Sequence, residues 1–414
     1  MSAARTLVLE AGIVFGVFFA PLAFGAVYPW GVLALSALFF LLFCLNSDTL
    51  LQFPSLPGYF RFSILLVLAW VLVQTQFFSV SPQQSRLELL QWLSFAALFM
   101  LCLKLPRTAV IWIFFFIVLA GTLESVYGLY EVLSGKEMIL WHSKEYHRGF
   151  VTGTYINRNN YAGFMEMALG VHGGLMLRAF HKKQGSFGAV LLLLLGVSMF
   201  GLIKSGSRVG LMGFLLSIGF HSLFLWKKNV KGWFALLFIL LACLGAGAAL
   251  GWSTLSARFL EFGASLKTLD GRLIAWHDMI PMLRRYALTG TGLGNFQWVF
   301  PAYQSDRLLY GWQHAHNDYL ELAAELGVPA AAVLITSFLS LWGASLSQAD
   351  RKDFSSFVLV LGGLAGAGSV ALHGFSDFNF AIPANAMTFV LILGLVTRLL
   401  QFNRQKILIK KNYD

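Results

Sequence analysis

Two closely spaced histidines stand in the stretch "GWQHAHNDYLELAAELG", where a polar segment gives way to an apolar one. The spacing of Asp318 and Glu321 resembles a capping box, so we expect a helix to begin at Asp318. His316 would then lie just outside that helix, where it could take a proton from an attacking hydroxyl near neutral pH. Alternatively, His314 and His316 are a structural pair, or part of a metal site that would need a third ligand.

A basic residue in the stretch "KTLDGRLIAWHDMIPMLRRY" could bind an anion. The pattern predicts a short amphipathic helix with Asp270 as its N-cap and with Leu273, Trp276 and Ile280 on one face. This places Arg272 in the first turn, where unpaired N–H groups and the helix dipole favour anions. The planar guanidinium also matches phosphate oxygens. The alternative is an arginine that is solvated or paired with an acid.

Two further polar residues are candidates. Arg208, in "IKSGSRVGLMGFLL", stands where an apolar run begins, so it could hold a lipid-linked phosphate or snorkel to lipid head groups. Asn295, in "LTGTGLGNFQWVF", could contact substrate or cap a turn. Because the lysine and the strand–loop–helix context of a phosphate-binding loop are missing, we expect Gly290, Gly292 and Gly294 to permit tight turns instead.

Membrane helices must position these residues. The 414 residues are 57% hydrophobic and 12% charged, with a mean hydropathy of +0.71, whereas soluble domains carry about 25% charged residues. Runs long enough to cross about 30 Å of hydrocarbon recur along the chain, so we expect an all-α polytopic membrane protein. Hydropathy predicts about twelve spans, the first of them retained rather than cleaved. Their limits are 7–27, 30–45, 62–78, 87–103, 109–130, 160–177, 187–203, 209–226, 232–251, 319–345, 355–372 and 382–400.

Positive charge indicates the orientation of these spans. Most lysines and arginines of the short loops and tails fall on one side if both termini are cytoplasmic. Arg86, Lys204 and Arg208 are the exceptions, in short external loops. We expect residues 1–414 to form a single membrane domain, with a long helical periplasmic loop at 252–318 that bears part of the active site.

Net charge and cysteines exclude some functions. The net charge of +11 is partly cytoplasmic, where it suits anionic membrane lipids and does not imply a nucleic-acid partner. Cys44, Cys102 and Cys243 lie in apolar runs, which argues against a disulfide framework or a thiolate metal site. The oligomeric state stays open.

The stretch "HNDYLELAAELG" resembles the signature of the O-antigen ligase family, within a superfamily that also contains O-antigen polymerases. The stretches "GTYINRNNYAG", "SGSRVGL", "DGRLIAW", "GTGLGNF" and "HGFSDFNFAIPANA" are similar to other landmarks of that superfamily. The resemblance runs from about Phe150 to the last predicted span. One departure favours a polymerase: three residues after Gly327 the ligase pattern usually has Gly, Thr or Tyr, and this chain has Ala330.

The resemblance implies a polytopic glycosyltransferase of the bacterial inner membrane, with a periplasmic active site and a glycan donor carried on undecaprenyl diphosphate. It implies that His316 is the catalytic base and that Arg208 and Arg272 hold the donor diphosphate. It further implies inversion of the anomeric centre, with no metal or other cofactor. Contacts with substrate are open for His314, Asn317, Asn295, Asn157, Asn159, Asp377, Tyr155 and His373.

Three functions are consistent with these features. Ligation of the donor glycan onto lipid A–core is the leading hypothesis. Polymerisation uses the same chemistry, but its acceptor is a second lipid-linked glycan. A transporter is the third, although transporters favour sites near the bilayer midplane and often show repeated halves. Here the ionisable residues gather at one face, and Asp377 could simply cap or pair locally.

Overall fold

The computed structural model describes residues 2–47, 56–226, 245, 262–308, 310–349 and 353–411, with the backbone alone at 262–270 and 404–411. Within these residues the protein is almost wholly helical, since only two short strands, β1 (Met138–Ile139) and β2 (His142–Ser143), pair antiparallel. The all-α fold expected from the sequence is confirmed. The span expected at 232–251 lies outside the described residues, apart from Gly245.

In the described ranges, nine helices are long and apolar enough to cross a membrane. They are α1 (Ala3–Leu22), α3 (Gly58–Phe77), α4 (Pro82–Cys102), α5 (Arg107–Ser134), α7 (Gly185–Lys204), α8 (Arg208–Trp226), α13 (Val328–Gln348), α14 (Phe354–His373) and α15 (Pro383–Lys411). Two more helices accompany them, the shorter apolar α2 (Pro29–Leu45) and the more polar α6 (Arg158–His181). A helix satisfies its own backbone hydrogen bonds, which lipid cannot do for it, so such runs fold as helices.

The single span expected at 319–345 is wrong. The structure divides it at Gly327 into α12 (Asp318–Leu326) and α13. Gly327 has a φ of +82°, and a Cβ there would strike the carbonyl oxygen of Leu288. Pro329 follows in the first turn of α13, where its missing N–H costs nothing. The break therefore separates a short helix at the bundle's end from the helix that crosses it.

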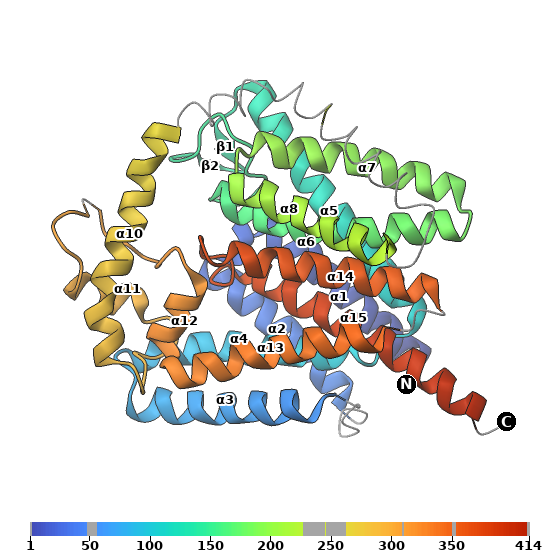
Figure 1. Ribbon diagram of the computed structural model, residues 1–414, viewed down its shortest axis with the longest axis horizontal. Helices are drawn as coiled ribbons and strands as arrows, with labels where there is room; N and C mark the ends of the chain where they lie inside the picture. Colours follow the sequence, from blue (N-terminus) through green and yellow to red (C-terminus); the bar gives the residue numbers. More distant parts are fainter. Residues whose placement is uncertain are drawn as a thin grey trace.

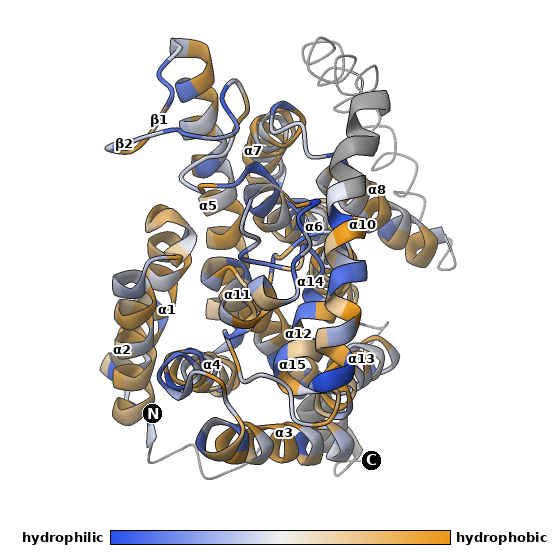
Figure 2. Ribbon diagram, turned by 90° about the vertical axis from the view of Figure 1, so that its left-hand side faces the viewer, coloured by the Kyte–Doolittle hydropathy of each residue, from blue (hydrophilic) through white to orange (hydrophobic). Residues whose placement is uncertain are grey.

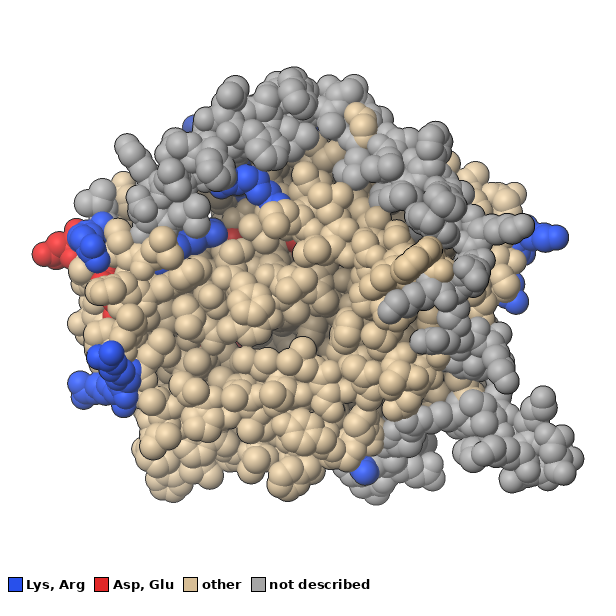
Figure 3. All heavy atoms as spheres, in the orientation of Figure 1, with Lys and Arg blue, Asp and Glu red and all other residues tan. Residues whose placement is uncertain are grey.

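The long helices run side by side along the molecule (Figure 1). α1 begins and α15 ends at one end of this bundle, while α10 (Phe262–Arg285), α11 (Phe296–Val299) and α12 lie at the other. Most of the described face in Figure 3 is free of charged side chains, which gather mainly toward its two ends. This arrangement suits a bundle that spans a membrane.

The end that carries α10 has a small hydrophobic core of its own. Apolar side chains of α10, α11, the following 3-10 turn η3 (Phe300–Ala302) and α12 form this cluster. The turn between α10 and α11 contains Gly290, Gly292 and Gly294, which all have positive φ, as expected for tight turns. Hydrophilic segments fill the middle of this end, between the helices (Figure 2).

Glycines bring α6 and α14 into backbone contact at the centre of the bundle. A Cβ at Gly170 would overlap the backbone of Gly366, and one at Gly362 would lie 2.9 Å from Cα of Gly174. Small residues spaced four apart on both helices permit this close approach, which stabilises helix pairs in membranes through van der Waals contact. The packing fixes α6 against α14, whose ends carry the polar residues described below.

We expect Gly366→Ala to lower the melting temperature of the detergent-solubilised protein, because its Cβ would lie 2.6 Å from the carbonyl oxygen of Met167. Gly368→Ala is the matched control two positions away, since its Cβ would meet only Trp342 Nε1 at 3.7 Å. Thermal unfolding of both variants checks this. Equal melting temperatures would contradict the proposed role of backbone contact.

Candidate active site

Asp377 joins three parts of the chain at the end of the bundle that carries α10. It lies in the turn between α14 and α15, with a side chain only 1% exposed. Its carboxylate accepts a hydrogen bond from Nδ2 of Asn159 at 2.7 Å, lies 3.5 Å from Nη2 of Arg272 and lies 3.4 Å from Nδ1 of His316. We call these four residues the Asp377 cluster. Three of the predicted site residues and Asp377 itself thus come together.

The electrostatics of the cluster favour an ionised Asp377. Burial would raise the pKa of this carboxyl, but His316, Arg272 and His373 act in the opposite direction. Their combined effect outweighs burial and holds the pKa of Asp377 well below its usual range. A buried carboxylate is stable only with such partners. Asp377 therefore supplies a fixed negative charge to the residues around it.

His316 is held in an uncommon backbone conformation. Its φ is +48°, in the left-handed region that residues other than glycine rarely adopt. Edge-to-face contacts with Trp312 and Phe378 hold its ring. Nδ1 is buried and faces Asp377 at ion-pair distance, without hydrogen-bond alignment. The side chain is 27% exposed, and Nε2 is the ring nitrogen left open to a substrate.

His314 has a different environment. Its Nδ1 lies 2.8 Å from Oε1 of Glu321, and its ring stacks on Phe378 at a centroid distance of 4.3 Å. Burial would lower the pKa of His314, but Glu321, with help from Asp377 and Glu88, raises it. The contact with Glu321 and the stacking on Phe378 tie the ring of His314 to its neighbours. This environment indicates a structural role for His314.

The helix expected to begin at Asp318 does begin there, but the capping box expected at Asp318 is wrong. The N-cap of α12 is Asn317, whose Oδ1 accepts hydrogen bonds from the N–H groups of Tyr319 and Leu320. Asp318 is the first residue inside the helix. Glu321 does reach back, but to the N–H of Ala315 at 2.7 Å. Because asparagine and aspartate cap equally well, the pattern alone did not distinguish the two positions.

Asn317 and Asp318 tie α12 to the turn that holds Asp377. Asn317 Nδ2 donates to the carbonyl of Phe375 at 3.0 Å. The N–H of Asp318 donates to the carbonyls of Gly374 and Asp377 at 2.8 and 3.2 Å, and its Oδ1 accepts the N–H of Phe380 at 3.1 Å. These bonds bring the segment with His316 to Asp377.

The helix start expected at Asp270, which would have placed Arg272 in the first turn, is also wrong. α10 begins at Phe262, so Asp270 is inside the helix rather than its N-cap, and Arg272 is past the first turn. The acid-paired alternative applies instead, since Arg272 contacts Asp377. Its side chain is 24% exposed. Five N–H donors and one contact at 3.5 Å leave most of its hydrogen-bonding capacity for a ligand.

Arg208, by contrast, does begin a helix. It is the first residue of α8, and its side chain is exposed. The preceding Ser207 accepts the N–H of Gly210 on its hydroxyl at 3.3 Å, as a helix cap does. The unpaired N–H groups and the dipole of a helix start, which favour a bound anion, are thus found at Arg208 and not at Arg272.

Two of the remaining candidates, Asn157 and Asn295, have structural contacts. Asn157 caps α6 by accepting the N–H of Asn159 at 2.8 Å. Asn295 is fully buried, and its Nδ2 donates to Ser79, Ser85 and the carbonyl of Thr291. It therefore anchors the turn before α11.

Tyr155 also has a structural contact. Its side chain is buried, and its hydroxyl donates to Oδ1 of Asn385 at 3.2 Å.

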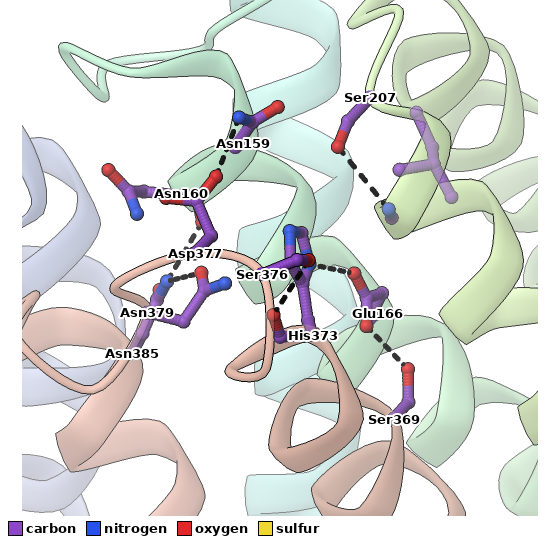
Figure 4. Close-up of polar contacts among 12 residues, drawn as sticks. Asn159, Asn160, Glu166, Ser207, Ser369, His373, Ser376, Asp377, Asn379 and Asn385 are labelled. Carbon is purple, nitrogen blue, oxygen red and sulfur yellow. Dashed lines mark hydrogen bonds and ion pairs between the residues drawn. The ribbon is translucent and has the colours of Figure 1, made fainter. Parts of the chain in front are cut away.

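Sequence reasoning missed a buried carboxylate behind the cluster. Glu166 of α6 lies 2.6 Å from Nδ1 of His373 and accepts the hydroxyl of Ser369 at 2.6 Å (Figure 4). A lone carboxylate within an apolar helix is the signal that could have identified it, since such residues face the bundle interior and pair there. Among the described residues, no group of three or more His, Cys, Asp or Glu has the geometry of a metal site.

A large apolar cavity adjoins this end of the protein. It measures about 1480 Å³ and lies between α3, α4, α8, α12, α13, α14 and α15. Asp318 and Tyr319 are among its few lining residues with polar side chains. The face in Figure 3 is hollowed near its middle, where tan side chains line the depression. A cavity of this kind accommodates an elongated apolar molecule.

Comparison with known proteins supports the resemblance. Residues 189–335, less than half of the chain, match the family described as O-antigen ligase. The matched segment contains Arg208, Arg272 and His316, whereas Asp377 lies beyond it. A search of curated proteins found no match. The match indicates, in general terms, a multi-pass membrane enzyme of the O-antigen ligase or polymerase type, acting on lipid-linked glycans.

Proposed function

We propose that the protein is an O-antigen ligase-like glycosyltransferase that moves a glycan from undecaprenyl diphosphate onto lipid A–core. The observation that carries this proposal is the shared carboxylate of Asp377, which contacts both His316 and Arg272. Asp377 thereby links the proposed base, His316, to the proposed phosphate ligand, Arg272. A base and a cation are the two side chains that this transfer requires.

The proposed reaction is a single displacement. Nε2 of His316 takes the proton of an acceptor hydroxyl as its oxygen bonds to the anomeric carbon of the donor sugar. The bond from that carbon to the diphosphate breaks, and its electron pair leaves with the diphosphate. Arg272 and Arg208 stabilise the negative charge of the leaving group. Attack opposite the leaving group inverts the anomeric centre.

Asp377 would act by positioning. Facing Nδ1, its carboxylate favours the tautomer that presents Nε2 as the acceptor, and it stabilises the imidazolium formed on proton transfer. Its contact with Arg272 limits how that side chain moves before a donor binds. Because arginines supply the positive charge, we propose that transfer needs no divalent metal.

The apolar cavity supports a lipid-linked substrate. Its lining is almost entirely aliphatic and aromatic, and it reaches Asp318 at the end of the bundle where His316 lies. A polyprenyl chain in this cavity would place its diphosphate near that end. Burial of each CH₂ group stabilises such binding by about 0.8 kcal/mol.

Polymerisation remains the second candidate because Ala330 departs from the ligase pattern. The two functions differ only in the acceptor, so one experiment separates them. Purified protein is given undecaprenyl-diphosphate glycan together with lipid A–core or a second lipid-linked glycan, each with and without EDTA. We expect glycosylated lipid A–core in both conditions. Extension of the lipid-linked glycan alone would favour the polymerase, and no product with either acceptor would contradict the proposal.

We further propose that the Asp377 cluster faces the periplasm, which places both termini in the cytoplasm. In a variant without the three native cysteines, Leu288→Cys should react with an impermeant thiol reagent added to the periplasm. Leu288 is exposed at the end with α10, and Ser347 is exposed near the opposite end of α13. Ser347→Cys should react only after the membrane is permeabilised. The reverse pattern would overturn the orientation.

A further inference from the structure

We propose that Arg158 forms, together with Arg208, the site that binds the diphosphate of the lipid-linked donor. Arg158 is the first residue of α6, and its Nε and Nη1 atoms are buried without a hydrogen-bond partner. A buried donor with no acceptor destabilises the protein, and more so when it is charged. A ligand that brings anionic oxygens to this guanidinium would remove that cost. The inference rests on the proposed function for the identity of the ligand.

Arg158 and Arg208 lie at neighbouring helix starts. A Cβ at Gly206 would be 3.5 Å from Nη1 of Arg158, and a Cβ at Gly210 would be 2.6 Å from Cβ of Ala162. From the first contact to the second, the residue number rises by four on both chain segments, from 206 to 210 and from 158 to 162. α6 and α8 therefore run parallel, with their first turns side by side. The turn that ends at Arg208 therefore packs against the guanidinium of Arg158.

The ring of Phe150 holds the guanidinium of Arg158 in place. The Cζ atom of Arg158 lies 4.3 Å from the ring centroid, a favourable cation–π distance. This contact leaves Nε and Nη1 without a hydrogen-bond acceptor. No acidic side chain among the described residues lies within ion-pair distance of Arg158. The helix dipoles of α6 and α8 add positive potential at the same point.

The residue after Arg158 links this site to the reacting groups. Asn159 donates its hydrogen bond to Asp377, which contacts His316 and Arg272 (Figure 4 shows the Asn159–Asp377 bond). A diphosphate bound at Arg158 and Arg208 would thus lie beside the cluster that holds the proposed base. We infer that Arg158 and Arg208 bind the diphosphate in the ground state, and that Arg272 meets it as the sugar departs.

Equilibrium binding of farnesyl diphosphate to the full-length protein in detergent tests this site without any transfer reaction. We expect Arg158→Gln to weaken binding by about tenfold or more, since it removes a charge-assisted contact. Arg158→Lys keeps the charge but loses the planar guanidinium, so its affinity for farnesyl diphosphate should lie between those of the unaltered protein and Arg158→Gln. Arg284→Gln, in the exposed last turn of α10, is the matched control and should bind like the unaltered protein. Size-exclusion profiles show whether each variant is folded, and Arg158→Lys carries the test if the glutamine variant is not.

Competitors distinguish the possible sources of the anion. Inorganic pyrophosphate should displace farnesyl diphosphate from the unaltered protein but weakly from Arg158→Gln, because the shared group is the diphosphate. Unchanged farnesyl diphosphate binding in folded Arg158 variants would overturn the proposal. So would displacement by phosphatidylglycerol micelles but not by pyrophosphate, which would indicate a lipid head-group site. Arg158-dependent binding in a protein with no transferase activity would leave this site standing and reject the proposed function.

Discussion

Replacing His316 with alanine is expected to lower the rate of glycan transfer by roughly 10²–10⁴-fold, the usual contribution of a general base. The open Nε2 atom and the carboxylate behind Nδ1 are the reasons, because together they give the ring one available acceptor. Donor binding should be nearly unchanged, since the arginines remain. Single-turnover transfer and farnesyl diphosphate binding, measured on the same preparation, separate the two effects.

His314→Ala is the control for this prediction. It removes an imidazole two residues away that stacks on Phe378 and pairs with Glu321. We expect a smaller loss of transfer, accompanied by lower thermal stability. If His316→Ala transferred glycan at the normal rate, or if His314→Ala alone abolished transfer in a folded protein, the base assignment would be rejected.

Asp377→Asn is expected to have the second largest effect, a loss of transfer of roughly 10²–10⁴-fold, as for other carboxylates that orient a catalytic histidine. The amide keeps the size of the side chain but removes the charge that faces His316 and Arg272. Asp353→Asn is the matched control at the opposite end of α14, where the carboxylate pairs with Arg107 at 2.5 Å. Transfer that falls equally in both variants would indicate a general loss of structure rather than of positioning.

The pH dependence of transfer gives a separate readout of Asp377. The pKa of the Asp377 carboxyl is lower in the folded protein than in the unfolded chain. Its charge therefore stabilises the fold fully when the pH is above the pKa of the unfolded chain. That stability is lost as the pH falls through the pKa of the folded protein. Asp377 therefore stays ionised between pH 5 and 8, so the factor by which Asp377→Asn lowers transfer should be the same throughout that range. A factor that shrinks toward the acidic end of the range would show that Asp377 is protonated there.

Hydropathy predicted most of the described membrane helices, but it missed the break at Gly327, and local patterns misplaced the cap of α12 and the start of α10. Lipid imposes helical structure on any sufficiently long apolar run, so the spans follow from composition. The helix starts depend on short polar contacts instead. Asn317 caps α12 where Asp318 was expected, and α10 extends back to Phe262 past the aspartate expected to cap it. The cap of α12 moved by one residue, whereas the start of α10 moved from Asp270 to Phe262 and took Arg272 out of the first turn.

The Asp377 cluster could be predicted only in part. His316 and Arg272 were identified from local patterns, but their common partner lies far along the chain, beyond α13 and α14. Contacts between distant segments leave no local spacing to detect. Arg158 and Glu166 were missed for a related reason, because their significance comes from what surrounds them: an absent acceptor in one case and a buried histidine in the other.

The location of Asp377 has a consequence for dissecting the protein. The segment that matches the O-antigen ligase family ends at residue 335, before the carboxylate that His316 and Arg272 share. Excised on its own, that segment would carry the imidazole and the guanidinium without the group that sets their separation. Cutting the chain in the loop between α13 and α14 would instead leave two pieces that must reassemble. Recovery of transfer on co-expressing them would then measure docking of α14 and α15 onto the rest of the bundle.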